Sequence, residues 1–269
     1  MQLSFMTWAC PDWTLTEVLT AALKYGYDSV EPRAECDQKH GVELEATKKD
    51  RKDIRARFED MGIGMCCIAT SCTYSDADPA RRLESVDLTK RFVDLAKDVG
   101  CAHLRIFGGP TPEGANYPDV KKYVAEAVRA ACEHAKGTGV YLCFETHDSY
   151  CSSADTLDVI RMVDHPSAAI CWDVMHPFRV GDTIQQAFDN VKDHVRHCHV
   201  HDGIRNAAGD WDLALMGEGE IPHDEAFKLL AGIGFQGAMS GEWISYLPAD
   251  EILPHDAAVM REYRKAAEG

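Results

Sequence analysis

Acidic residues stand at the ends of several apolar runs, where a strand would deliver them to the rim of a sheet. The run that begins at residue 168 ends in Asp173, and His176 follows three residues later, just before a proline. Glu145 and Glu242 occupy similar positions at the ends of two other runs. For any one acid, a salt bridge or a helix N-cap explains the position equally well. The repetition of the pattern favours a functional site.

These side chains would make a metal site if they met. Glu145, Asp173, Glu242 and one of the three histidines in segment 195–201 provide three carboxylates and an imidazole. Such a hard, mostly oxygen donor set suits Mn²⁺ best, with Mg²⁺, Co²⁺ or Zn²⁺ as further options. Without a cation the carboxylates would repel one another and their pKa values would rise. The sequence therefore predicts one divalent metal ion.

Strands and helices must alternate along the chain to bring these residues together. Strand-like runs lie at 2–8, 28–32, 64–70, 103–107, 140–146, 168–173, 195–201 and 237–243, and helical spacing lies at 14–25, 47–61, 79–99, 119–136, 153–163, 183–191, 223–231 and 250–266. Segment 203–222 is expected to be a long polar loop. Eight such units without a linker predict an α/β protein, a (β/α)8 TIM barrel filling one domain over residues 1–269. A doubly wound sheet is the competing architecture.

The amino-acid composition disfavours some classes of binding partner. The chain has 269 residues, 45% of them hydrophobic, and carries 28 Lys+Arg against 44 Asp+Glu, a formal net charge of -16. So acidic a surface argues against nucleic-acid and membrane partners. The first eight residues lack the features of a signal peptide, and many of the 11 cysteines fall inside apolar runs without a C-x-x-C pair. We expect reduced thiols and a cytoplasmic protein.

The motifs together resemble those of one enzyme superfamily over the whole length of the chain. They comprise Thr7-Trp8-x-x-Pro11-x-Trp13, Gly26-Tyr27-Asp28-x-Val30-Glu31, the Glu145 strand, Asp173-x-x-His176, His199-x-x-Asp202, Gly217-Glu218-Gly219-Glu220-Ile221-Pro222 and Glu242. In order and spacing the chain is similar to the xylose isomerase-like sugar phosphate isomerase/epimerase superfamily, which contains ketose 3-epimerases, inosose dehydratase and endonuclease IV.

The resemblance implies roles for particular residues. A single divalent metal would be held by Glu145, Asp173, His199 and Glu242. His176 and Arg205 would touch substrate oxygens. His197 would be a deeper barrel residue and His201 a rim residue. A small-molecule carbohydrate substrate and a homo-oligomer, dimer or tetramer, are implied as well.

The expected chemistry is proton transfer by the two glutamates. Glu145 and Glu242 would approach the metal from opposite sides, so that one removes a proton beside a carbonyl and the other returns it through a metal-stabilised enediolate. Return to the same carbon epimerises the sugar, and return to the neighbouring carbon isomerises it. The further substrate contacts that we expect are His147, Trp8, Glu31 and Trp243.

Other functions remain open at this stage. The same proton abstraction followed by loss of a hydroxyl would make a lyase acting on an inosose, a dehydroshikimate-like acid or a 3-keto-glycoside. Cys151 stands where ketose 3-epimerases have a substrate-binding glutamate, which argues against a free ketohexose. Thr70 and Phe107 replace histidines that an endonuclease IV-like metal cluster would need, so DNA repair is disfavoured. A non-catalytic sugar-binding barrel is the remaining alternative.

Overall fold

A parallel sheet forms the centre of the molecule. The computed structural model describes residues 1–244 and 246–269. Seven strands hydrogen-bond in the order β1 (Gln2–Phe5), β11 (Ala238–Gly241), β8 (Val195–Val200), β7 (Ala168–Asp173), β6 (Tyr141–Glu145), β5 (His103–Ile106) and β4 (Ile68–Ala69). All of the pairings within this sheet are parallel.

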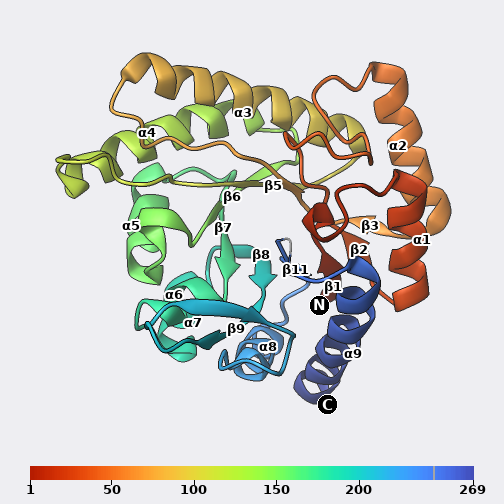
Figure 1. The fold of residues 1–269 in the computed structure, drawn as a ribbon. Coiled ribbons are helices and arrows are strands. Elements are labelled where there is room, and N and C mark those ends of the chain that lie inside the picture. The colour runs from red at the N-terminus through yellow and green to blue at the C-terminus, as the bar shows by residue number, and fades with distance from the viewer. Residues whose placement is uncertain (245) are drawn as a thin grey trace.

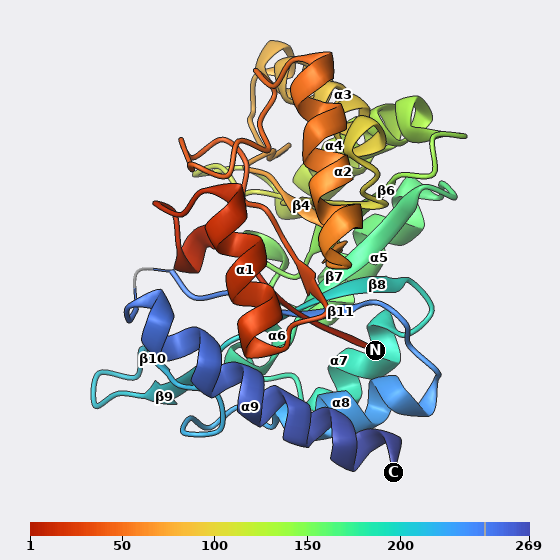
Figure 2. The ribbon, with the colours of Figure 1, turned by 90° about the vertical axis from the view of Figure 1, so that its right-hand side faces the viewer.

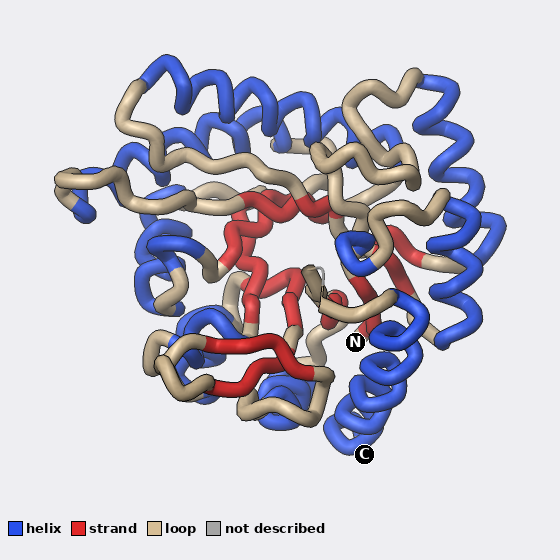
Figure 3. The backbone as a smooth tube through the Cα atoms, viewed as in Figure 1, coloured by secondary structure: helices blue, strands red, loops and turns tan. Residues whose placement is uncertain are grey.

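Two short strands close the ring. β2 (Ser29–Val30) pairs in parallel with β3 (Gly64–Met65). Single parallel bridges join Met6 to Glu31 on one side and Arg33 to Ala69 on the other. The strands therefore encircle the centre of the molecule (Figure 3). The predicted TIM barrel is confirmed, with the expected third strand broken into β3 and β4.

Helices cover the outside of the ring (Figure 1). They are α1 (Leu15–Tyr25), α2 (Lys48–Met61), α3 (Pro79–Val99), α4 (Tyr117–Ala135), α5 (Ser153–Val163), α6 (Met175–Arg179), α7 (Ile184–Val191), α8 (His223–Gly232) and α9 (Ala249–Glu268). Three of them begin with a capping box at Thr14, Thr47 or Thr183. A threonine side chain there accepts a hydrogen bond from an otherwise unpaired backbone N–H, which fixes where the helix starts.

Each central strand has two faces of different character. Along β6 and β7, the outward residues Phe144 and Trp172 belong to the main hydrophobic core beneath the helices. The inward residues Cys143 and Cys171 form a separate small cluster with Ala169. Side chains alternate between faces along a strand, so the inward rows that carry these small residues also carry the acids and histidines.

The segment after β8 differs from the expectation of a long loop. Residues 202–214 form an antiparallel hairpin of β9 (Asp202–Arg205) and β10 (Trp211–Ala214). This hairpin lies on the opposite side of the barrel from the N terminus (Figure 2). Its charged sequence hid the strand pattern, because only one face of an exposed hairpin needs apolar residues. The helical turn α6 after Asp173 was likewise not expected.

The helices and the cysteines of the described residues bear on the expected absence of membrane partners and on the expected reduced thiols. None of their helices combines the length and the apolar character that crossing a bilayer requires. All 11 cysteines are free, and Cys36 is the one among them that is not buried.

Candidate metal and substrate site

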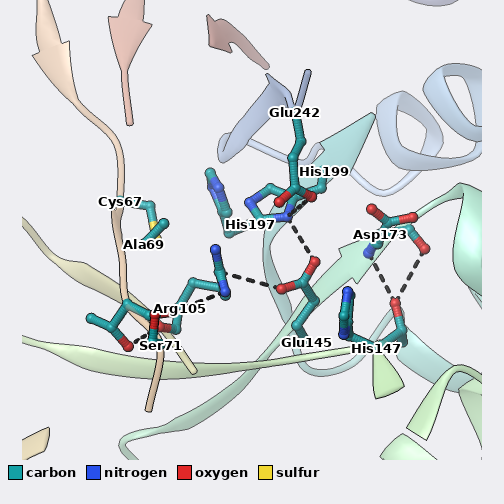
Figure 4. Close-up of polar contacts among 12 residues, drawn as sticks. Cys67, Ala69, Ser71, Arg105, Glu145, His147, Asp173, His197, His199 and Glu242 are labelled. Atoms are coloured by element: carbon teal, nitrogen blue, oxygen red, sulfur yellow. Dashed lines mark hydrogen bonds and ion pairs between the residues drawn. The ribbon is translucent and has the colours of Figure 1, made fainter. Parts of the chain in front are cut away.

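The sheet register brings the four predicted ligands together at the carboxyl ends of the strands. Asp173 is in register with His199 on the neighbouring strand, and Glu145 is the last residue of β6. Glu242 follows β11 directly, and its backbone N–H donates to the carbonyl of Val200 at 3.1 Å. One ligand atom from each of the four side chains lies within 4.8 Å of the others. Figure 4 shows Glu145, His199 and Glu242 turned toward one another, with Asp173 beside them.

His199 occupies the middle of this group. Its Nδ1 lies 2.8 Å from Oε1 of Glu145 and 3.2 Å from Oε2 of Glu242. On the other edge of the ring, Nε2 lies 3.0 Å from Oε1 of Glu31. An ionised carboxylate can only accept a hydrogen bond, so Glu31 holds the proton on Nε2. By the same argument Nδ1 donates to Oε1 of Glu145 in this structure, and a cation among the three carboxylates would displace that proton and take up the Nδ1 lone pair.

The charges of the site perturb its titration. Burial lowers the pKa of His199, but the surrounding carboxylates of Glu31, Glu145 and Glu242 raise it well above its ordinary value. Burial raises the pKa of Glu242, but the neighbouring positive charges, led by His199, outweigh burial and bring it to about 2. The pKa of Asp173 is also held well below its usual range, because His176 and His201 outweigh the effect of burial.

The residues present fit a divalent cation. Three buried carboxylates and one imidazole converge, and the free edge of the imidazole is set by a second carboxylate behind it. That carboxylate–histidine arrangement is how proteins orient a metal-binding imidazole. Among the described residues, Oε2 of Glu145 accepts no hydrogen bond although it is buried. An unsatisfied carboxylate oxygen in such a place is an available ligand.

Asp173 is held in place by its neighbours. Oδ1 accepts from the backbone N–H of His176 at 2.9 Å, and Oδ2 lies 2.8 Å from Nε2 of His201. The backbone N–H of Asp173 donates to the hydroxyl of Thr146 at 2.9 Å. Asp173 therefore reaches the cluster in one fixed orientation. His201, expected as a rim residue, is the side chain that fixes it.

His176 and His147 lie next to one another beside the cluster. Their rings are 4.6 Å apart, and the ring of His176 is 5.3 Å from that of His201. Nδ1 of His147 lies 3.0 Å from Oδ1 of Asp148. Nε2 of His176 is 3.9 Å from Oδ2 of Asp173, and His147 lies against His176; the contacts of both with substrate stay predictions.

Glu31 occupies a different position from the one that we expected. Its carboxylate is fully buried and lies 2.8 Å from Nε2 of His197, in addition to its contact with His199. Both of its oxygens lie within hydrogen-bond distance of histidine nitrogens, which suits a role in supporting His199, and a substrate contact of Glu31 stays a prediction. His197 is buried and hydrogen-bonded, as expected of a residue deeper in the barrel.

The two tryptophans expected at the site differ in exposure. Trp8 is partly exposed and lies under the guanidinium group of Arg33, with Cζ 4.8 Å from its ring centroid. Trp243 is buried, and its ring covers Gly241, where a Cβ atom would meet the ring at 1.8 Å. Glycine at position 241 is therefore required by the close approach of that ring.

Arg205 lies away from the four-residue group. It is exposed on the β9–β10 hairpin, where Nε donates to the carbonyl of Gly209 at 3.4 Å. Its side chain lines a surface pocket of about 690 Å³ together with Phe178, Trp211 and Glu220. The hairpin thus places Arg205 on an exposed surface whose pocket none of the four cluster residues lines, and its contact with substrate stays a prediction.

Two buried arginines belong to the surroundings of the site. Arg105 is fully buried on β5, and its Nε lies 3.3 Å from Oε2 of Glu145 (Figure 4). Arg33 is 3% exposed at the end of the second barrel strand. Neither has a role in the motif pattern. An arginine inside an apolar strand run, as in the sequence around Arg105, is the signal that could have identified one of them, since charged residues are seldom buried without a partner.

The glycine-rich segment after the hairpin folds around a carboxylate. Asp202 accepts hydrogen bonds from the backbone N–H groups of Gly203, Gly217, Gly219 and Ile221, at 2.9 to 3.2 Å. A Cβ atom at Gly219 would lie 2.0 Å from Oδ1 of Asp202. This motif is therefore structural, since it anchors the loop that follows β10.

Comparisons with known proteins agree with this architecture. The family model for the xylose isomerase-like TIM barrel matches residues 19–263. The chain is 26% identical to fructoselysine 3-epimerase of Shigella flexneri over 177 residues, which cover 62% of this chain and 62% of the relative.

Solved structures superpose over nearly the whole chain. The probable 3-DHS dehydratase AsbF from Bacillus anthracis gives a TM-score of 0.82 at 18% identity, covering 97% of this chain and 99% of its own. The IOLI protein with a binding zinc atom gives 0.81 at 17% identity, covering 100% and 98%. At these identities the superpositions establish a shared fold.

Proposed function

Because the chain belongs to the xylose isomerase-like TIM barrel family, we propose that it is a divalent-metal-dependent isomerase or epimerase of a small carbohydrate. The observation that carries the proposal is the convergence of Glu145, Asp173, His199 and Glu242. Its curated relative, an epimerase, is consistent with that class of reaction, although the match covers 62% of each chain.

The four converging residues would hold the metal ion. Mn²⁺ is the best match to three carboxylates and one imidazole, with Mg²⁺, Co²⁺ or Zn²⁺ as alternatives. When bound, the ion would supply Lewis-acid polarisation of a substrate carbonyl and so make the adjacent C–H more acidic. Glu31 would keep the proton of His199 on Nε2, which leaves Nδ1 available to the ion.

Glu145 and Glu242 would carry the proton. They approach the cluster from strands on different sides of the ring, and both lie within hydrogen-bond distance of His199. One carboxylate would remove the proton beside the carbonyl, and the other would return it. Transfer between two carboxylates on opposite sides of a bound sugar inverts or shifts a stereocentre without loss of any atom.

His176, His147 and Trp8 would orient the sugar. The two histidine rings lie edge to face, with their centroids 4.6 Å apart, and can donate to or accept from hydroxyl groups. Trp8 is partly exposed and offers an apolar face of the kind that packs against the C–H face of a sugar.

The decisive experiment is proton exchange with solvent. The chelated protein, reloaded with Mn²⁺, would be incubated in D₂O with a panel of ketoses, inososes and keto-glycosides, and the products examined by NMR and mass spectrometry. We expect metal-dependent deuterium incorporation at one carbon and a product of unchanged formula. Loss of water or of an aglycone would identify a lyase instead. Absence of exchange with any member, with and without metal, would contradict the proposal.

A further inference from the structure

Arg33 is a buried cation that has no carboxylate partner among the described residues. It is 3% exposed, yet among the residues that the structure describes it forms no ion pair, whereas the equally buried Arg105 lies 3.3 Å from Glu145. The free-energy penalty for burying an unpaired charge is comparable to the whole free energy of unfolding of a small domain. A buried guanidinium without an ion pair is therefore a candidate binding group for an anionic ligand.

The hydrogen bonds of Arg33 use its two terminal nitrogens and leave Nε without an acceptor among the described residues. Nη1 donates to the carbonyl oxygens of Ala34 and Ala69, and Nη2 donates to the hydroxyl of Ser71 at 2.5 Å. Nε is buried and has no partner among the described residues. The backbone contacts hold the guanidinium plane in place over Trp8, and they do not neutralise its charge.

Arg105 adds a second set of unused donors close by. Its Nη1 donates to the carbonyl of Thr70 at 2.9 Å, on the same segment that Arg33 contacts. Its Nη2 has no partner among the described residues, and Nε faces Glu145 without hydrogen-bond alignment. Burial and then the charge of Arg105 lower the pKa of Arg33, so the two groups repel each other.

We propose that Arg33 and Arg105 bind a carboxylate of the substrate, so that the substrate is a keto acid of the sugar type and not a neutral ketose. This inference rests on the proposed function and refines its substrate class. Unused N–H donors on two fixed guanidinium groups match a planar, negatively charged acceptor. Because Arg105 lies against Glu145, the carboxylate would sit close to the carbon that loses its proton.

The charges of the site are consistent with that assignment. Glu145, Asp173 and Glu242 would be offset by a divalent cation and Arg105, and Glu31 is already paired with histidines. Among the described residues Arg33 has no carboxylate within ion-pair distance, and a substrate carboxylate would provide one. Glu35 and Glu242 act on Arg33 only through their charges, without forming an ion pair with it.

Three small ligands that share a hydroxyketone test the inference. Hydroxypyruvate carries a carboxylate where dihydroxyacetone carries a hydroxymethyl group, and dihydroxyacetone phosphate carries a phosphate. Dissociation constants would be measured by calorimetry with and without Mn²⁺. We expect wild-type protein to bind hydroxypyruvate at least about tenfold more tightly than dihydroxyacetone. Equal binding of the two would overturn the inference, and a preference for the phosphate would overturn the assignment to a carboxylate.

Two variants of Arg33 and one matched control locate the preference. Arg33→Met is expected to abolish the acid preference, and Arg33→Lys to retain part of it. Arg82→Met is the control, because Arg82 also lies over an aromatic ring, that of Tyr123, and also donates to backbone carbonyls, but near the surface. An acid preference that survives both Arg33 variants would contradict the proposed contact. If Arg33→Met fails to fold, Arg33→Lys and the wild-type ratio still decide the question.

The binding data and the exchange data can fail independently. Deuterium exchange of neutral ketoses with no acid preference would leave the proposed function intact and refute the carboxylate site. Arg33-dependent binding of hydroxypyruvate without metal-dependent exchange in any substrate would keep the site and refute the proposed reaction.

Discussion

Two buried carboxylates of this molecule, Asp202 and Glu145, have opposite surroundings. Asp202 is 1% exposed, and four backbone N–H groups surround its two oxygens. Glu145 is just as buried, but Oε2 accepts no hydrogen bond among the described residues; Oε1 lies 2.8 Å from Nδ1 of His199 and Oε2 lies 3.3 Å from Nε of Arg105.

The difference separates a structural acid from an acid kept for binding. Backbone amides cannot leave or change protonation, so a carboxylate that they surround is fixed in charge and place. A carboxylate that faces ionisable side chains, as Glu145 faces His199 and Arg105, retains an open lone pair that a bound cation can use. The comparison predicts opposite effects on function and stability when each group is changed.

The largest effect is expected at the cluster. Glu145→Gln and Glu242→Gln should each lower kcat roughly 10³-fold, because the proton carrier is removed, while the thermal midpoint stays close to that of the wild type. Solvent deuterium exchange and thermal denaturation would measure the two quantities. Glu220→Gln, at an exposed rim glutamate, is the control and should retain full activity. Full activity of both cluster variants would remove the distinction between the two groups.

The second effect concerns Asp202. Asp202→Ala should lower the free energy of unfolding by about 3 kcal/mol, because several buried N–H groups lose their acceptor. Urea denaturation would measure this loss. Metal affinity, taken from calorimetry on the folded fraction, should change far less than stability. A stable Asp202→Ala protein would show that the loop does not depend on this carboxylate.

The buried histidine His40 should make the free energy of unfolding depend on pH. Burial lowers the pKa of His40 to about 4, and its ring lies between the carbonyl of Arg33 and the backbone N–H of Val42. The folded state therefore binds fewer protons than the unfolded state between pH 6.5 and 4. The contribution of His40 to stability is present above pH 6.5 and is lost as the pH falls toward 4.

The size of that contribution can be isolated by difference. From 6.5 to about 4, the pKa shift corresponds to at most about 3 kcal/mol. The free energy of unfolding of wild type minus that of His40→Gln, measured between pH 4 and 8, should decline on the acidic side. A difference that is flat over this range would mean that His40 is not held neutral by the fold.

The smallest effect is expected from the carboxylate behind the cluster. Glu31→Gln should weaken Mn²⁺ binding by roughly 10- to 100-fold, since an amide no longer fixes the proton of His199 on Nε2. Calorimetric titration of the chelated protein would measure the affinity. Glu59→Gln, at an exposed acid on α2, is the control. Unchanged affinity in Glu31→Gln would show that His199 needs no such support.

Much of the architecture could be predicted from local patterns. The bounds of α3 and α5 agree with the helical spacing, and α1, α2 and α7 begin one residue after the expected threonine, which serves as the cap. The hairpin β9–β10 and the turn α6 could not be predicted in this way. Their short, partly exposed segments carry no periodic pattern that distinguishes them from a loop.

The amino-acid sequence by itself determined the alternation of strands and helices and the placement of acids and histidines at the strand ends, because periodicity and capping act within a few residues. Only the tertiary structure decided which of those side chains meet. Parallel register set Asp173 beside His199, and the curvature of the ring brought Glu31 behind His199. In the part of the chain that the structure describes, it also left Arg33 buried without a carboxylate partner. Contacts of this kind join residues more than a hundred positions apart, as Glu31 and His199 are, and depend on the closed barrel.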